Sequence, residues 1–489
     1  MKRLYKYQFY VSGLLILIFS CTPKQETNQN QKEEPKFKIV SEIKSDKESQ
    51  FYIPLDEYPE DRKSLPIGVF DSGTGGLAVL NTIYEMDNFN NSSHQKGTDG
   101  EMDFAAEKFI YLADDANMPY GRYDAEGKAD FLRELVIKDV QFLLDDEYYT
   151  SPDENTSKHD KQNVKAIVIA CNTATAYGLE TVQNAVDYWG LDVEIFGIVD
   201  AGAREVLSNL QNPEKSIIGV LATEGTVSSK GYPKAILKNY GGDIAIVQQA
   251  GIGLAGAIDG DLNYIDPQAT NPRDSKAYQG PDIGHEKYPL DESLWEEYNF
   301  EEGNSLLVAT NDNGDRKHAQ LNSVNNYIRY MVTHMVKNTL DIYPDKTISR
   351  VILGCTHYPY EVEQIKEHFL YIRGLNETYE ALIAEDIQFI DPSESLGAEL
   401  YSYMVEEDLW GKNRNEDSEF YISVPNTLLE ENVIGKNGKF TYDYKYGRVE
   451  NVSMQYVKRV PFSDEWIDAT VKERMKTNIP YTYEMIYKQ

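Results

Sequence analysis

The sequence predicts an α/β fold built on parallel sheets. Short apolar runs recur along the chain, and segments with apolar residues at helical spacing lie between most of them. This alternation is typical of parallel sheets, because parallel strands need a crossover connection that a helix can supply. Two of the runs, Ala166 to Ala170 and Arg350 to Gly354, are each followed by a cysteine and further polar residues. Open α/β sheets collect ligands at the carboxyl ends of their strands, so this pattern indicates where a site lies.

The composition is that of a globular protein and argues against one class of partner. The 489 residues, 41% of them hydrophobic and 26% charged, are enough for two or three domains. A formal net charge of -32 supplies no basic face for phosphate contacts, so no nucleic-acid partner is predicted. The three cysteines form neither a disulfide framework nor a CxxC pair for zinc or redox chemistry.

The N-terminus is typical of an export signal. Three basic residues within the first six precede an apolar run from Val11 to Phe19, which is short for a membrane span. Ile18 to Cys21 resembles the lipobox of bacterial lipoproteins, in which the cysteine is acylated. We therefore expect a signal peptide over residues 1–20 and a lipid anchor at Cys21. An uncleaved signal anchor and a chance cysteine are the alternatives.

The segment after Cys21 is polar. From Thr22 to about Ser64 it is rich in Lys, Glu, Gln, Asn and Ser, with few residues that could build a core. Such a composition is typical of a flexible linker. We expect a tether over residues 21–64, with folding beginning near Leu65.

The folded body follows in a regular order. Leu65 to Phe70 predicts a strand that ends in a glycine-rich turn, and Leu77 to Met86 predicts the helix after it. Further buried strands are expected at residues 109–113, 166–170, 194–199, 216–221, 244–248, 351–354 and 387–390. Three irregular stretches interrupt the pattern and are interpreted as two insertions and an extension: residues 87–107, about 263–315, and the tail from about Trp410.

Cys171 and Cys355, each placed directly after a predicted strand, indicate a chemistry as a pair that neither indicates alone. A single buried cysteine usually packs as a small hydrophobic residue. Racemisation, however, requires one acid/base group on each face of a Cα atom, because the proton leaves from one face and returns to the other. Cys171 and Cys355 suit this chemistry if their pKa values are brought toward the working pH by their surroundings.

Other residues near these strands allow simpler interpretations when taken singly. Gly73, Gly75 and Gly76 could form a plain tight turn or part of a nucleotide loop, but their spacing is not GxGxxG and no Walker lysine follows. Asp71 alone could cap a helix, and His357 alone could be a core histidine.

Taken together, the motifs carry a family resemblance. Five segments, in this order, contribute to it: Ile67 to Leu77 (IGVFDSGTGGL), Asp114 through Pro119-Tyr120-Gly121, Cys171-Asn172-Thr173, Ala222 to Val227 (ATEGTV) and Gly354 to Pro359 (GCTHYP). They resemble the motifs of glutamate racemase, and Phe420 to Pro425 is similar to the strand near that family's C-terminus. Apart from the insertions, the resemblance covers roughly Pro66 to Ala398.

The resemblance implies an architecture. It implies an α/β fold of two doubly wound domains with approximate pseudo-twofold symmetry and the active site between them. The first domain is expected over residues 66–193 together with 358–489. The second is expected over residues 194–357, including the insertion at about 263–315.

The resemblance also implies residue roles. Cys171 and Cys355 become the two catalytic acid/base thiols, assisted by Asp71 and His357. The implied substrate-binding set is Asp71, Ser72, Pro119, Tyr120, Gly121, Cys171, Asn172, Thr173, Thr226, Cys355, Thr356 and His357. No metal and no cofactor, pyridoxal phosphate included, are implied.

The chain departs from the family pattern at one place. Where the family usually has a Cys-Pro pair and then a glutamate on a short helix, this sequence runs from Gln249 to Asp259 and Gly260 without the pair. The carboxylate is kept but is one methylene shorter. Asp259 is therefore predicted only as an auxiliary residue.

The predicted function is cofactor-independent interconversion of L- and D-glutamate, which provides D-glutamate for peptidoglycan. The alternatives are a racemase for aspartate or another amino acid, and a lipoprotein that binds an amino acid without turning it over. The expected partners are the amino acid and the membrane, reached through the lipid at Cys21, and a homodimer is left open.

The expected location is the cell envelope, on its periplasmic or surface face. Glutamate racemases ordinarily supply cytoplasmic precursors, so the cytoplasm is the alternative. Basic residues ahead of the apolar run favour export.

Overall fold

The computed structural model describes residues 35–411, 418–429, 433–435, 438–467 and 469–487. The expected signal peptide and Cys21 lie outside these ranges. None of the helices within them has the length and apolar character that crossing a bilayer requires.

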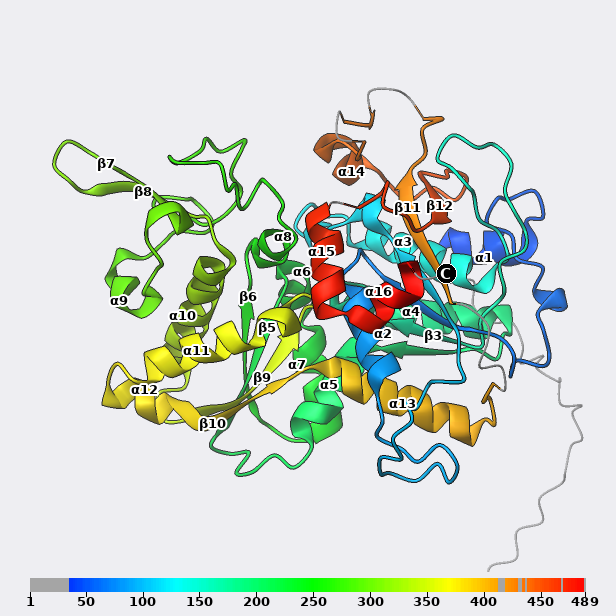
Figure 1. Ribbon diagram of the computed structural model, residues 1–489, viewed down its shortest axis with the longest axis horizontal. Helices are drawn as coiled ribbons and strands as arrows, with labels where there is room; N and C mark the ends of the chain where they lie inside the picture. Colours follow the sequence, from blue (N-terminus) through cyan, green and yellow to red (C-terminus); the bar gives the residue numbers. More distant parts are fainter. Residues whose placement is uncertain (1–34, 412–417, 430–432, 436–437, 468, 488–489) are drawn as a thin grey trace, which may run out of the picture. The chain divides into compact units, whose positions relative to one another are not determined.

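The first sheet holds six strands in the order β12-β11-β2-β1-β3-β4. Of these, β3, β11 and β12 are labelled in Figure 1. All its pairs are parallel except the one between β11 and β12. Its members are β1 (Ile67–Asp71), β2 (Phe109–Ala113), β3 (Ala166–Ile169), β4 (Glu194–Gly197), β11 (Glu419–Pro425) and β12 (Val457–Pro461). β1 is central and fully buried, which explains its continuous apolar sequence. Register pairs Phe70 of β1 with Ile169 of β3, so Asp71 and Cys171 follow at the same edge.

The second sheet holds four parallel strands in the order β10-β9-β5-β6. They are β5 (Ser216–Ala222), β6 (Ala245–Ala250), β9 (Thr347–Gly354) and β10 (Ile383–Ile390). Ala222 pairs with Gly354, so the residues that follow β5 and β9 again leave the sheet at one edge. A separate antiparallel pair consists of β7 (Leu306–Thr310), which lies within the predicted insertion, and β8 (Arg316–Leu321), which directly follows it.

Helices connect the strands and pack on the sheets (Figure 1). Their bounds are α1 (Lys38–Ser45), α2 (Gly76–Glu85), α3 (Ala129–Leu144), α4 (Asn172–Trp189), α5 (Ile198–Leu207), α6 (Glu224–Ser229), α7 (Gly231–Tyr240), α8 (Leu254–Ile258), α9 (Trp295–Tyr298), α10 (Val324–Ile342), α11 (Val362–Arg373), α12 (Glu377–Leu382), α13 (Pro392–Glu406), α14 (Tyr442–Gly447), α15 (Ala469–Asn478) and α16 (Pro480–Tyr487). Short 3-10 turns include η2 (Asp115–Asn117), η3 (Tyr120–Arg122) and η6 (Tyr358–Glu361). The predicted α/β class is confirmed.

The apolar core joins the two sheets. One cluster combines Ile67 and Val168 of the first sheet with Ile218 and Ile352 of the second. A second cluster covers the other face of the first sheet, and a third packs α10 and α11 on the second sheet. The strands that end near the cysteines are thereby held by continuous packing.

The tether predicted over residues 21–64 is wrong from Pro35 onward. Helix α1 buries Ile39, Val40 and Ile43, and Phe51 and Ile53 are buried after it. The Trp189 indole Nε1 donates to the Val40 carbonyl at 2.8 Å, which ties this segment to α4. Apolar residues spaced for one helix face are enough to hold a segment whose overall composition is polar.

Sheet membership differs from the predicted domain ranges at two strands. β4, expected in the second domain, pairs with β3 in the first sheet. β10, expected in the first domain, pairs with β9 in the second sheet. The chain crosses between the sheets after these strands, through α5 and α13, and those two helices pack on each other. The internal symmetry stays a prediction.

The tail is part of the fold. β11 and β12 extend the first sheet, and α16 packs beside α2 (Figure 1). The Thr482 backbone N–H donates to Asn81 Oδ1 at 3.2 Å. The C-terminal segment therefore lies against the helix that follows the glycine-rich turn.

Candidate active site

Asp71 ends β1 and organises the glycine-rich turn. Its Oδ2 accepts the backbone N–H groups of Gly73 at 3.2 Å and Gly76 at 3.0 Å. A Cβ atom at Gly76 would lie 2.4 Å from Asp71 Cβ, so this close turn requires glycine. Burial raises the pKa of Asp71, while the His357 charge and the backbone N–H groups act in the opposite direction.

Cys171 stands at the start of α4, directly beyond β3. It is 6% exposed, its thiol donates to Ser72 Oγ at 3.5 Å, and its sulfur accepts the Ala174 N–H at 3.4 Å. Burial, followed by the negative charge of Asp71, raises the pKa of Cys171 to about 12. At neutral pH this thiol is protonated.

Cys355 stands directly beyond β9, with a histidine beside it. It is 5% exposed, and its Sγ lies 3.6 Å from His357 Nδ1. His357 Nε2 lies 2.9 Å from Asp259 Oδ2. Burial lowers the pKa of His357, but the anionic Asp259 and the Cys355 sulfur outweigh it, so the pKa lies well above its usual value. The imidazole can thus hold a proton next to the thiol.

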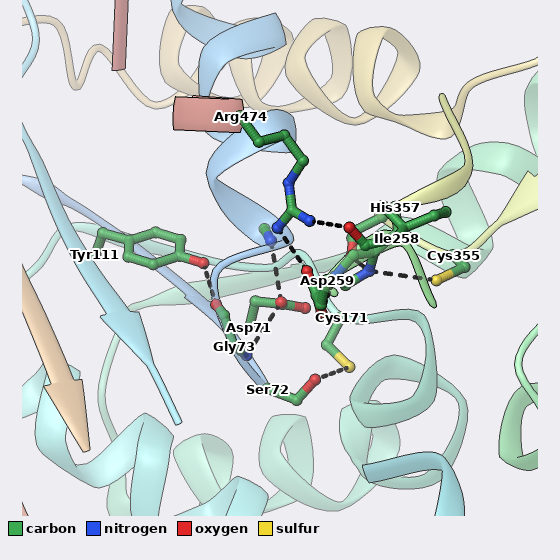
Figure 2. A network of polar contacts seen from close by, with 12 residues as sticks. Asp71, Ser72, Gly73, Tyr111, Cys171, Ile258, Asp259, Cys355, His357 and Arg474 are labelled. Atoms are coloured by element: carbon green, nitrogen blue, oxygen red, sulfur yellow. Dashed lines mark hydrogen bonds and ion pairs between the residues drawn. The ribbon is translucent and has the colours of Figure 1, made fainter. Parts of the chain in front are cut away.

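Asp259 caps the end of α8 and has a second partner from the tail. Arg474 Nη2 on α15 donates to Asp259 Oδ1 at 2.5 Å, and its Nη1 donates to the Ile258 carbonyl at 2.6 Å (Figure 2). Burial favours the neutral acid, but His357 and Arg474 outweigh it and hold the pKa of Asp259 at about 2. The carboxylate is therefore ionised at neutral pH.

The residues from the two sheets converge. Figure 2 shows Asp71 and Cys171 in the same network view as His357 and Cys355. A Cβ atom at Gly75 would lie 2.5 Å from Thr356 Oγ1 and 2.6 Å from His357 Cε1. The glycine-rich turn of the first sheet therefore touches the strand end of the second.

A hydroxyl cluster makes a second link between the sheets. Thr173 Oγ1, from the start of α4, lies 3.1 Å from Thr226 Oγ1 in α6. Both contact Thr223 Oγ1, at 3.1 Å and 3.0 Å. Three polar hydroxyls thus gather where helices begin beyond β3 and β5.

Asn172 has a buried donor that is unused. Its Oδ1 accepts the Tyr232 hydroxyl at 2.6 Å, whereas its Nδ2 has no hydrogen-bond partner among the described residues. A buried amide donor without a partner is costly, and a ligand acceptor would satisfy it.

The Pro119 to Gly121 segment differs partly from its predicted role. Gly121 packs closely on Gly225, since a Cβ atom at Gly225 would lie 2.7 Å from Gly121 Cα. The Tyr120 side chain instead contacts two buried carboxyl groups, because its hydroxyl oxygen lies 2.5 Å from Asp114 Oδ2 and 2.7 Å from Asp139 Oδ2. Burial and the charge of Asp114 raise the pKa of Asp139 to about 8. The Tyr120 hydroxyl therefore contacts buried carboxylates, and Pro119 accepts the Tyr446 hydroxyl through its carbonyl.

Three further residues complete the site. Thr223 lies inside the ATEGTV segment, so its motif already contained the signal. Tyr232 and Arg474 had no such signal, because one is among 36 tyrosines and the other stands in the irregular tail.

Comparison with known proteins finds similar racemases. The family model described as Asp/Glu/Hydantoin racemase matches residues 153–275. The glutamate racemase of Oceanobacillus iheyensis is 32% identical over 172 residues, covering 35% of this chain and 46% of that enzyme. The glutamate racemase of Thermoanaerobacter pseudethanolicus is 25% identical over 360 residues, covering 74% and 88%. A solved glutamate racemase of Francisella tularensis in complex with D-glutamate has a TM-score of 0.43 at 22% identity, covering 74% and 88%.

Coverage differs among the relatives. The chain spans about half the length of the Oceanobacillus enzyme and of its Ralstonia pickettii counterpart, at 46% and 54%. The glutamate racemase of Lactobacillus acidophilus is 30% identical over 241 residues, which cover 47% of this chain and 72% of that enzyme. At that identity over most of a relative's length, the chain belongs to the glutamate racemase family.

Proposed function

We propose that this protein is a glutamate racemase that moves the Cα proton between two thiols without a cofactor. One observation carries the proposal: two buried cysteines follow parallel strands of different sheets, and each has its own polar partners. Cys171 contacts Ser72, and the charge of Asp71 raises its pKa. Cys355 contacts His357, which is paired with Asp259.

The two surroundings suit opposite protonation states. Cys171 is a protonated acid in the free protein, because its pKa is about 12. Cys355 has an imidazole at 3.6 Å that can take up its proton, leaving a thiolate to act as the base. In one direction Cys355 removes the Cα proton of the substrate and Cys171 donates its own to the opposite face. The reverse direction exchanges these roles.

Fixed donors support binding of a carboxylate substrate. The unpartnered Asn172 Nδ2 and the hydroxyls of Thr173, Thr226 and Thr356 lie beyond the strand ends with the cysteines. Backbone N–H groups at the start of α4 add to them, since helix N-termini favour anions. Such donors stabilise the charge that develops on the carboxylate when Cα is deprotonated.

The direct test is Cα hydrogen exchange in D₂O together with circular dichroism on L- and D-glutamate. The wild-type chain is compared with Cys171→Ser and Cys355→Ser. Racemisation in both directions by the wild type, lost in both variants, is the expected result. Turnover of aspartate but not glutamate would change the substrate, and no turnover of any amino acid by folded protein would leave a binding lipoprotein instead.

A lipid anchor at Cys21 and a place in the cell envelope belong to the same proposal. Their support is the basic start, the short apolar run and the lipobox-like residues before Cys21. Two or three acyl chains on one residue give stable anchoring. Cys21→Ala is expected to move the protein from the membrane fraction to the soluble fraction and to change its mobility on a gel, and unchanged behaviour in both would refute lipidation. Supply of D-glutamate for peptidoglycan is the proposed use of the product.

A further inference from the structure

We infer that Arg474, on helix α15 of the tail, is a positioning residue that fixes the Asp259 carboxylate and, through it, orients His357 toward Cys355. The inference rests on the proposed function for its meaning in catalysis. The supporting contacts join Arg474, in the tail, to Ile258 and Asp259.

The contacts form an unbroken path. Arg474 contacts Asp259 Oδ1 at 2.5 Å, Asp259 Oδ2 lies 2.9 Å from His357 Nε2, and His357 Nδ1 lies 3.6 Å from Cys355 Sγ. Each carboxylate oxygen therefore has one partner. An arginine on one side prevents the carboxylate from rotating away from the imidazole on the other.

The guanidinium also forms a hydrogen bond with the backbone next to Asp259. Its Nη1 donates to the Ile258 carbonyl at 2.6 Å, at the end of the five-residue helix α8. Two parallel donors on one planar group define both the position and the orientation of Asp259. A lysine could supply the charge but not two donors in a fixed planar arrangement.

The helix that bears Arg474 is firmly held. Val471, Met475 and Ile479 on or next to α15 are buried in the core cluster shared by both sheets. The Arg474 side chain is 14% exposed and lies 5.9 Å from the Tyr360 ring centroid. The arginine is thus delivered to the site by packing and does not depend on a free chain end.

The arrangement compensates for the short aspartate. Asp259 stands where the family resemblance leads one to expect a glutamate, so its carboxylate has less reach. Anchoring α8 and the carboxylate together gives the shorter side chain a fixed direction toward His357. The charge of Arg474 also helps to keep Asp259 ionised, against the effect of burial.

Two measurements test the inference, and one of them does not depend on racemase activity. The first is the rate of iodoacetamide labelling of Cys355, read by peptide mass spectrometry and normalised to the complete labelling of the same peptide in unfolded protein. The second is kcat and KM for glutamate. Both are measured on the wild type, Arg474→Gln, Arg474→Lys, Asp259→Asn and the Asp259→Asn/Arg474→Gln double variant. Lys476→Gln removes an exposed charge from the same helix and is the matched control.

Arg474→Gln is expected to slow Cys355 labelling at least about threefold and to lower kcat about tenfold with KM changed less than about twofold. Asp259→Asn should act in the same direction, because His357 loses the anion that favours its protonated form. In the Asp259→Asn background, Arg474→Gln should have almost no further effect, since it acts through Asp259. Arg474→Lys should fall between the wild type and Arg474→Gln, and it replaces that variant in the comparison if Arg474→Gln does not fold.

Unchanged or faster Cys355 labelling in folded Arg474 variants overturns the inference. So does an equal effect of Arg474→Gln in both backgrounds, which would make it a direct charge effect on the thiol. Absence of turnover by the wild-type chain would refute the proposed function alone, because the labelling rates would still decide whether Arg474 acts through Asp259.

Discussion

Cys171 and Cys355 are the same residue type in unlike surroundings, and each thiol has a different polar partner. Burial and the neighbouring Asp71 keep Cys171 protonated, whereas Cys355 has an imidazole beside it whose protonated form is favoured. The free protein is therefore asymmetric although the sequence presents the cysteines as a matched pair.

Gly75 offers a test of how tightly the two halves of the site meet. Its backbone φ is -61°, which alanine adopts freely, so the cost of Gly75→Ala comes only from the clash with Thr356 and His357. We expect a fall in kcat of about tenfold or more, because displaced catalytic groups lose their alignment. Steady-state kinetics measures it, and Gly447→Ala, at an exposed helical glycine with no atom near the added methyl, is the control. Equal kinetics in the two variants would mean that the turn yields without moving His357.

Asp259 predicts a pH-dependent contribution to stability. Its pKa is 3.8 as a reference value and about 2 in the folded protein, so the group stabilises the fold above the unfolded pKa. That contribution, on the order of 2 kcal/mol, is lost as the pH falls from about 4 toward 2. Urea unfolding of the wild type and Asp259→Asn should show a gap in the free energy of unfolding at pH 6 that closes near pH 2. A gap that stays constant with pH would contradict the assigned pKa.

At the residue scale, the site residues that lie within the sequence motifs could be predicted. Asp71, Cys171, Cys355 and His357 converge because each lies at the end of a strand or just beyond it, and strand ends can be predicted from an apolar run. Arg474 could not be predicted, since its partner Asp259 is far away in the chain and the tail has no pattern that fixes its direction.

At the scale of elements, the parallel strands were predictable, whereas β7, β8 and β12, which form antiparallel pairs, and a short amphipathic helix were not. Every expected strand exists, and the strands buried along their whole length, such as β1 and β5, are the ones with a nearly continuous apolar run. Helix α1 was missed because three apolar residues among eight leave the composition polar. Whether such a helix packs on the fold depends on the hydrophobic surface that other parts of the chain present to it. The sequence of the helix alone does not contain that information.

The docking of α1 can be measured. Ile43 is fully buried, so Ile43→Ala should lower the free energy of unfolding by about 2–5 kcal/mol. Lys47→Ala, at an exposed position just beyond the same helix, should change it by less than about 0.5 kcal/mol. Chemical denaturation of both variants supplies the numbers, and equal stabilities would restore the tether interpretation for this segment.

At the scale of the molecule, the apolar cluster shared by the two sheets predicts joint unfolding. Trp189 reports on α4 beside the first sheet, and Trp295 reports on the insertion packed with the second. Chains that retain only Trp189 or only Trp295, with the other tryptophans changed to Phe, should melt at one midpoint by fluorescence. Two midpoints separated by more than the measurement error would show that the sheets unfold independently.

The division of the chain between the sheets shows what single-sequence reasoning lacks at this scale. The predicted domain boundaries followed the motifs. In the structure β4 still belongs to the first sheet and β10 still belongs to the second, and the chain crosses to the other sheet only after each of them. Strand pairing depends on neighbours that are distant in the sequence, and the sequence of β4 or β10 alone does not indicate which strand it pairs with.

The late position of Arg474 has a consequence for the timing of biosynthesis. A chain leaves the ribosome N-terminus first, at roughly 5–20 residues per second, so Asp71 emerges tens of seconds before the helix that clamps Asp259. Every other member of the Cys171 and Cys355 network is present while α15 is still missing. A nascent or truncated chain that lacks α15 would therefore carry both thiols without the arginine, and the site would be complete only once α15 has been synthesised.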